Sequence, residues 1–283
     1  ADKVAPRVKS GALLSDAAAQ YTRRALDHTF RSTLRRLRDW SRSSSADTVA
    51  MESTFRLRLE ADARSDFLIE CHIDRVDHAA GAAVVTDYKT GTPDLTLAEI
   101  TAGYRLQLIT YLMAVLESSN EPLLPGALLY IYLQSGTRSV AVPAGGVPAA
   151  PPKGLRGYFL ADDAILSALD NRLGTEDSVL PVGYKKSGGY KSTAPVLTME
   201  EMRALFDTVK RRLTGLYGEL RRGRFPIRPV RYKGQTPCQW CDYRSICRFD
   251  LKFRDNRYED LPSARDGEIR KTLLADAGKE EQP

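Results

Sequence analysis

Residues 71–91, CHIDRVDHAAGAAVVTDYKTG, form the stretch of sequence that decides the fold. The residues on both sides of Ala80-Gly81 are rich in Val and Ile, which favours strands over residues 67–76 and 82–88. The short Gly-containing segment between them is typical of a hairpin turn. We therefore expect two antiparallel strands that pair with each other.

This hairpin would bring three charged side chains together. Asp87 and Lys89 are two residues apart, so both side chains point to the same face of the sheet. If the turn has two residues, Ala79 pairs with Ala82, and counting back along the strand places Asp74 directly opposite Asp87. Directly paired residues hold their Cβ atoms about 5 Å apart, so the two carboxylates would lie close together.

A carboxylate pair of this kind suits a divalent cation. The two groups repel each other unless a cation lies between them, and hard ions such as Mg²⁺ prefer oxygen ligands. Bound Mg²⁺ or Mn²⁺ can activate water and neutralise charge on a phosphoryl oxygen, and Lys89 can hold the attacking water or stabilise developing charge. The alternative is a set of surface charges on an edge hairpin, because D-x-K alone is short and occurs by chance.

The composition of the 283 residues is that of a globular protein, with 42% hydrophobic and 28% charged residues. A formal charge of +6 suits a polyanionic partner but also fits a mildly basic protein of another kind. The opening residues, ADKVAPR, contain no apolar run, so a cytoplasmic location is expected. The sequence has no G-x-x-x-x-G-K-[ST] phosphate-binding loop, which excludes an ATP-driven motor within this segment.

The remaining elements are predicted from apolar periodicity, working outward from the hairpin. They are a helix over 12–41, a strand over 54–59, a helix over 97–118, a strand over 128–134 and a helix over 160–173. Residues 143–157, rich in Pro and Gly, are predicted to form a loop. A last long helix begins at Thr198, where Glu201 can complete a capping box, and Gly223 can end it.

Two polar side chains on the helix after the hairpin have helical spacing. Gln107 and Tyr111 are four residues apart, so they share one face, and Gly103 lies on that face one turn earlier. Taken alone, this spacing is equally typical of an ordinary helix surface.

Three motifs, in the order in which they follow one another along the sequence, resemble those of the RecB-like branch of the PD-(D/E)XK nuclease superfamily. They are Ile73-Asp74-Arg75-Val76-Asp77, Asp87-Tyr88-Lys89-Thr90-Gly91 and Gln107-x-x-x-Tyr111. Residues 125–130, 153–160 and the C-terminal cysteines also look like those of AddB-type nuclease domains, which belong to bacterial AddAB helicase–nucleases. The resemblance covers about residues 12–258.

The resemblance implies an α/β fold with a restriction-endonuclease-like core, in which helices flank a mixed central sheet. It also implies a helical C-terminal extension with a Cys-rich loop. We expect an N-terminal helical segment over 1–50 and a nuclease core with its cysteine extension over 51–258. A polar tail over 259–283 is expected to be poorly ordered or to wrap over the surface.

The same resemblance implies the roles of the site residues. Asp74, Asp87 and the Tyr88 carbonyl would bind Mg²⁺ or Mn²⁺, Lys89 would be catalytic, and the Gln107/Tyr111 pair would position the DNA strand. The implied activity is exonucleolytic cleavage of single-stranded DNA during double-strand-break resection, with an AddA-type helicase–nuclease subunit as partner. The alternatives are a stand-alone exonuclease of the CRISPR-adaptation type and a non-catalytic DNA-binding subunit.

Three cysteines, Cys238, Cys241 and Cys247, lie within ten residues, a spacing typical of a metal-binding loop. Three thiolates are one short of a tetrahedral zinc site or a cubane cluster, and the spacing alone does not separate the two. The resemblance favours a 4Fe–4S cluster whose fourth cysteine lies outside this chain or is absent.

Other residues relate to the family pattern less directly. Glu52 matches a Glu that precedes the first strand in the family and is a secondary candidate. His28 lies too close to Glu52 to match the family's upstream His, so we interpret it as a helix-surface residue. Cys71 stands where Gly is usual, and we interpret it as a small buried residue.

Two basic stretches could contact DNA phosphates, although a solvated face is the alternative for each residue. They are Lys185, Lys186 and Lys191 in a Gly-rich loop, and Arg221, Arg222, Arg224, Arg228, Arg231 and Lys233 around the last long helix.

Overall fold

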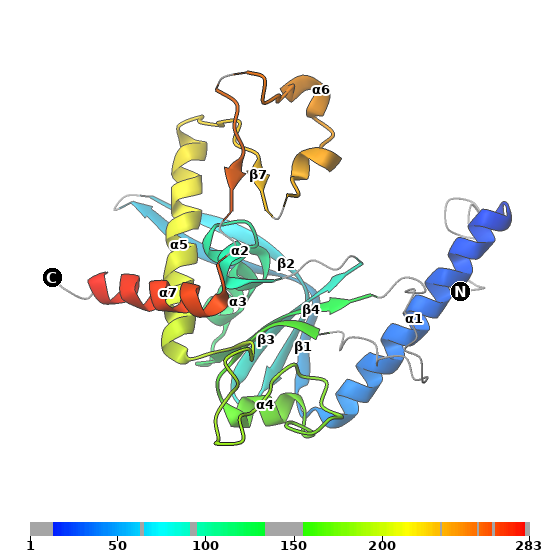
Figure 1. Ribbon diagram of the computed structural model, residues 1–283. Helices are drawn as coiled ribbons and strands as arrows, with labels where there is room; N and C mark the ends of the chain where they lie inside the picture. The colour runs from blue at the N-terminus through cyan, green and yellow to red at the C-terminus, as the bar shows by residue number, and fades with distance from the viewer. Residues whose placement is uncertain are drawn as a thin grey trace. The chain divides into compact units, whose positions relative to one another are not determined.

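The computed structural model describes residues 14–62, 65–90, 95–133, 155–232, 234–253, 255–261 and 264–280 (Figure 1). The predictions for Gly91, the 134–154 stretch and Lys233 lie outside these residues. Within the described ranges, no helix combines the length and apolar character needed to cross a bilayer.

Two compact units make up the chain. The first comprises residues Ala1–Ser53, Ile73–Asp94 and Gly126–Val196, and the second comprises Thr54–His72, Leu95–Pro125 and Leu197–Pro283. Strands β1 (Asp47–Asp62) and β2 (Ser65–Ala79) contribute residues to both units. The domain boundaries expected at residues 50 and 258 stay a prediction.

A six-stranded sheet with strand order β1-β2-β3-β4-β5-β6 is the central layer of the fold. Its later strands are β3 (Ala82–Lys89), β4 (Leu124–Tyr132), β5 (Leu155–Leu160) and β6 (Val196–Leu197). Every described residue of β4 after Leu124 is buried, as expected for a central strand. The α/β class predicted from the sequence is confirmed.

The β2–β3 hairpin has the register predicted from its turn. The strands are antiparallel, with Ala79 opposite Ala82 and Arg75 opposite Thr86. Ala80 and Gly81 have φ values of 48° and 74°, so both turn residues are left-handed, as a type I′ turn requires. The face and partner of each residue along β3 follow from this two-residue turn.

The helix predicted over 97–118 is wrong as a single element, because the structure has two helices there. These are α2 (Leu97–Thr101) and α3 (Gln107–Ser118). Gly103, with φ 84°, lies between them in a conformation that ends a right-handed helix.

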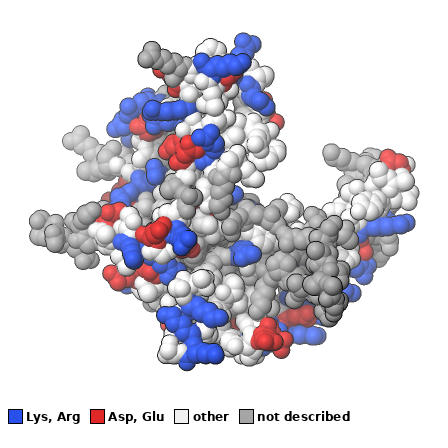
Figure 2. All heavy atoms as spheres, viewed as in Figure 1, with Lys and Arg blue, Asp and Glu red and all other residues white. Residues whose placement is uncertain are grey.

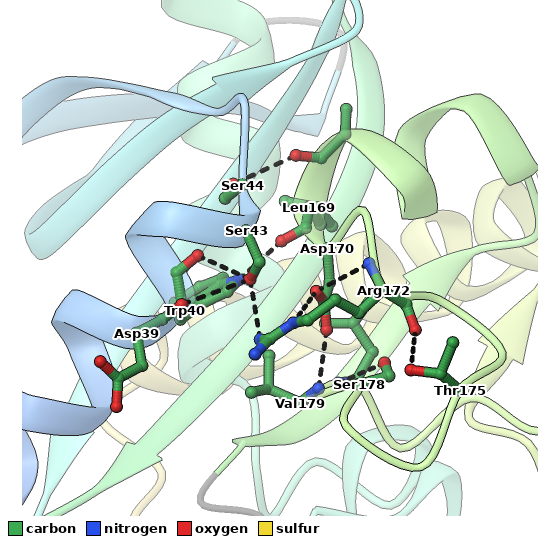
Figure 3. A network of polar contacts seen from close by, with 12 residues as sticks. Asp39, Trp40, Ser43, Ser44, Leu169, Asp170, Arg172, Thr175, Ser178 and Val179 are labelled. Atoms are coloured by element: carbon green, nitrogen blue, oxygen red, sulfur yellow. Dashed lines mark hydrogen bonds and ion pairs between the residues drawn. The ribbon is translucent and has the colours of Figure 1, made fainter.

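The C-terminal end of α1 (Ala17–Ser43) is anchored by polar contacts within the first unit (Figure 3). The indole of Trp40 donates a 2.7 Å hydrogen bond to the Leu169 carbonyl at the end of α4 (Asp163–Leu169). Asp170, which has no exposed surface, accepts hydrogen bonds from Val179 N at 2.7 Å and from Arg172 Nε at 3.0 Å. Arg172 also donates to Ser43 Oγ at 2.8 Å, so one buried carboxylate joins three segments.

Strand β5 was not predicted, and it begins inside the expected loop over 143–157. It pairs antiparallel with β4, and Gly157 lies opposite Leu129. Gly157 has φ 148°, and a Cβ there would lie 1.9 Å from the Leu128 carbonyl oxygen. The glycine is therefore required by close strand approach, which apolar periodicity does not reveal.

Helix α5 (Met199–Arg221) is the longest element of the second unit. Its predicted capping box between Thr198 and Glu201 is confirmed, and Gly223 follows its end with φ 64°. The polar tail contains a helix that was not predicted, α7 (Asp266–Glu280), which packs against α5 and α2 (Figure 1). Arg270 of α7 lies 3.6 Å from the Glu201 carboxylate.

Candidate active site

Two carboxylates and one lysine meet at the end of the β2–β3 hairpin, inside the first unit. One further step along the observed register sets Asp74 against Asp87. Asp74 Oδ2 accepts a 2.8 Å hydrogen bond from the backbone N–H of Tyr88, which holds this carboxylate against β3. Lys89 Nζ lies 2.7 Å from Asp87 Oδ2. The structure therefore brings together Asp74, Asp87 and Lys89, as the sequence predicts.

Asp87 lies in a strongly desolvated position, with only 3% of its surface exposed. Burial raises the pKa of this carboxyl and the nearby Asp74 raises it further, while the hydrogen bond and charge of Lys89 act in the opposite direction. Lys89 is also 5.4 Å from the centre of the Tyr130 ring, a distance at which the ring attracts the ammonium group. Lys89 is thus the ion-pair partner of Asp87, while the carboxylate of Asp74 repels that of Asp87.

The donor chemistry fits a hard divalent cation. Asp74 and Asp87 supply carboxylate oxygens, and the raised pKa of Asp87 reflects a charge that a cation would stabilise. The part of the chain that the structure describes contains no cluster of three or more His, Cys, Asp or Glu side chains placed to hold a metal ion. The role of the Tyr88 carbonyl as a further oxygen ligand stays a prediction.

A second polar network lies on the opposite face of the same strands, and the sequence analysis did not identify it. Asp77, only 1% exposed, accepts hydrogen bonds from Arg75 Nε at 2.8 Å and from Thr48 Oγ1 at 2.6 Å. The Arg75 guanidinium lies 5.7 Å from the Trp40 ring centre. These contacts fix β1, β2 and the end of α1 behind the carboxylates. The spacing of Arg75 and Asp77, two residues apart on a strand, could have predicted that they share the face opposite Asp74. Their partner Thr48 is remote in sequence and could not have been predicted.

The Gln107/Tyr111 pair, which is predicted to position the DNA strand, lies on α3 in the second unit. Gln107 Nε2 donates a 2.9 Å hydrogen bond to the Tyr111 hydroxyl, which confirms that the two side chains share one helix face. Their action on the substrate of the carboxylate pair stays a prediction.

The structure also shows the positions of the three residues that relate less directly to the family pattern, His28, Glu52 and Cys71. His28 is exposed on α1, as interpreted from the sequence. Glu52 is exposed in β1 and has φ 47°, a left-handed conformation that is unusual for a residue other than glycine. Cys71 is 2% exposed, and burial raises the pKa of its thiol to about 11. A thiol of that pKa stays protonated at neutral pH, in agreement with a structural role.

The clustered cysteines lie in the second unit, on the 3-10 helix η2 (Pro237–Trp240), the turn after it and α6 (Arg244–Cys247). Cys238, Cys241 and Cys247 are free thiols and line one pocket of about 210 Å³ together with Arg244 and Tyr258. The shared pocket fits a partial ligand set, although these three thiols do not form a complete metal site in the described part of the chain.

Residues 1–248 match the PD-(D/E)XK nuclease superfamily. Curated relatives named as a subunit of an ATP-dependent helicase/deoxyribonuclease include a protein of Desulforamulus reducens, 29% identical over 92% of this chain and 24% of the relative. A protein of the same name from Symbiobacterium thermophilum is 30% identical over 98% of this chain and 25% of the relative. The chain thus spans about a quarter of the length of these relatives. The match and the carboxylate–lysine hairpin agree, and the chain belongs to the PD-(D/E)XK nuclease superfamily, with its restriction-endonuclease-like α/β core.

Proposed function

We propose that this chain is the metal-dependent deoxyribonuclease domain of an AddB-type protein, acting on single-stranded DNA when broken ends are resected. The carboxylate pair with its adjacent lysine carries the proposal, because two carboxylates that can hold a divalent cation beside a lysine can support phosphodiester hydrolysis. The curated relatives support the assignment to a helicase–nuclease complex. An AddA-type subunit is the proposed partner, and the cytoplasm is the proposed location.

Each group at the hairpin end has a proposed task. Bound Mg²⁺ or Mn²⁺ would supply Lewis-acid neutralisation of the phosphate charge. Asp74 and Asp87 would hold the cation through their carboxylate oxygens, and the Tyr88 N–H keeps the Asp74 carboxylate oriented. Lys89 donates hydrogen bonds to the attacking water or to the developing negative charge, from a position that Asp87 and the Tyr130 ring restrict.

A substitution of one carboxylate tests the proposal. We expect Asp87→Ala to abolish Mg²⁺-dependent cleavage of a single-stranded oligonucleotide while the circular dichroism spectrum stays native. Asp177→Ala is the matched control, because Asp177 is an exposed aspartate away from the hairpin. Retained Mg²⁺-dependent cleavage by the Asp87 variant would show that the active site lies elsewhere.

The relatives also bear on the alternative functions. A stand-alone CRISPR-adaptation exonuclease is less well supported, because the curated relatives carry the name of a helicase/deoxyribonuclease subunit. A non-catalytic DNA-binding protein would have no need of a lysine beside a desolvated aspartate. Equal cleavage by the wild type and by the Asp87 variant, at a low rate without Mg²⁺ dependence, would favour that non-catalytic function.

The cysteine pocket carries a second part of the proposal. We propose that Cys238, Cys241 and Cys247 supply three thiolates to a 4Fe–4S cluster, with the fourth ligand from outside this chain. Their opening onto one pocket supports this assignment over three unrelated thiols. Protein prepared without oxygen should show broad visible absorption that Cys241→Ser removes, whereas bound zinc without such absorption would favour a structural zinc site.

A further inference from the structure

An open groove of about 1250 Å³ lies wholly within the second unit. The start of β2, the C-terminal half of α5 and the segment after α5 line it. Pockets for small molecules usually measure about 300–1,000 Å³ and enclose their ligand, so a groove of this size and openness fits a length of polymer better. The residues assigned to catalysis at the hairpin end are not among those that line it.

Aromatic side chains line the groove at two places. Phe67 and Tyr217 stack face to face, with ring centres 4.1 Å apart and planes 8° from parallel. Phe225, after the end of α5, is 71% exposed. Leu216 and Leu220 on α5 are also more than half exposed. Covering such an apolar surface with flat, apolar groups is favourable, because it removes apolar area from water.

Arginines surround these apolar residues. Arg211, Arg212, Arg224 and Arg228 line the groove, against two glutamates, Glu219 and Glu259. Glu219 is already engaged, because Arg224 lies 3.1 Å and Arg222 3.6 Å from its carboxylate. Figure 2 shows Lys and Arg side chains gathered over the C-terminal end of α5. The lining therefore carries an excess of positive charge.

We propose that this arginine–aromatic groove is an accessory binding site for single-stranded DNA, in addition to the active site. Guanidinium groups would contact successive phosphates, and Phe225 with the α5 leucines would contact the faces of unpaired bases. Duplex DNA hides those faces in its stack, so the groove should prefer single strands. The inference rests on the proposed function only in taking DNA as the polymer, and its test does not depend on cleavage.

Fluorescence anisotropy of a labelled 20-nucleotide oligothymidylate, with EDTA present, measures this binding directly. Removing two phosphate contacts in the variant Arg211→Gln/Arg228→Gln should weaken binding and lower the slope of log K against log salt by about 1.4. Phe225→Ala should weaken binding at least about fivefold and leave the salt slope unchanged. The matched controls are Arg31→Gln/Arg38→Gln and Phe30→Ala, exposed residues of α1 in the first unit.

The controls decide the outcome. Near-native affinity of both control variants, together with weaker binding of both groove variants, supports the site. The proposal is overturned if the arginine variant loses no more affinity than its charge-matched control, or if Phe225→Ala binds as the wild type does. A groove that docks a protein segment would give this last result. Binding is measured in EDTA without cleavage, whereas the active site is tested by Mg²⁺-dependent cleavage, so failure of the proposed active site and failure of the groove give different results.

Discussion

Lys89 Nζ lies 2.7 Å from Asp87 Oδ2, and both side chains project from the last residues of β3. The pair is asymmetric in its exposure. The Lys89 side chain is 29% exposed, whereas that of Asp87 is 5% exposed. The lysine can therefore turn toward a ligand at the surface while the aspartate stays fixed. This difference in exposure leads to different predictions. Replacing Lys89 should lower the catalytic rate, whereas replacing Asp87 should stabilise the metal-free protein.

Replacement of Lys89 should impair chemistry more than structure. We expect Lys89→Met to lower kcat for single-strand cleavage by about 10²–10³-fold, the effect of removing one donor to a developing charge. Mn²⁺ affinity, measured by calorimetry, should not fall, because both carboxylates remain. Lys89→Arg keeps the charge and should recover part of the activity. Cleavage by Lys89→Met at the wild-type rate would contradict the assigned role.

Replacement of Asp87 should make the metal-free protein more stable. Its folded-state pKa is raised above the ordinary value, first by burial and then by Asp74. A raised carboxyl pKa means that the folded protein favours the protonated form, so stability falls as pH rises through that pKa. Asp87→Asn mimics the neutral form and should add on the order of 1 kcal/mol at pH 7 in EDTA. The gain should shrink in mildly acidic buffer, and urea unfolding at the two pH values measures both effects.

Asp170 should show the reverse pH dependence. Burial raises the pKa of this carboxyl, but hydrogen bonds from Val179 N and Arg172 outweigh burial and hold the pKa below its usual range. A lowered pKa gives stability that is present above the unfolded-state value and lost as pH falls through the folded-state value. Asp170→Asn should cost about 2–3 kcal/mol at pH 7, and less in acid below about pH 4. The exposed Asp177→Asn is the control, and an equal loss in both variants would argue against the network in Figure 3.

Gly157 should tolerate no side chain. A Cβ at this position would lie 1.9 Å from the Leu128 carbonyl oxygen, in a conformation with φ 148°. We expect Gly157→Ala to cost more than about 3 kcal/mol, because backbone atoms of a central strand would have to move. In contrast, Gly218→Ala within α5 should stabilise by about 1 kcal/mol, since it meets only the end of the Arg222 side chain. Thermal unfolding of the two variants provides the comparison.

The sequence predicted the carboxylate hairpin well because every step depends on local rules. Side chains alternate along a strand, and a two-residue turn sets the partner of each residue. The capping box at Thr198 is local in the same way. The break at Gly103 was missed because the apolar periodicity of α2 and α3 continues across it.

Features that depend on remote contacts were not predicted. The buried Arg75–Asp77 pair needs Thr48 from a neighbouring strand, and β5 needs a glycine where its neighbour approaches closely. Helix α7 has almost no apolar face of its own, and Leu273 is buried among its described side chains. Its helical structure depends on packing against α5 and α2, which the sequence of the tail alone does not show.

The turn at Ala80-Gly81 also has a consequence for how this region can vary. Because the side chains of β3 alternate between faces, inserting or deleting one residue in the turn would rotate Asp87 and Lys89 to the far side of the sheet, away from Asp74. Such a variant would keep Asp74, Asp87 and Lys89 in its sequence, but the three side chains would no longer lie on one face of the sheet. For the proposed activity, the length of the Ala80-Gly81 turn is therefore as strict a requirement as the identity of the aspartates.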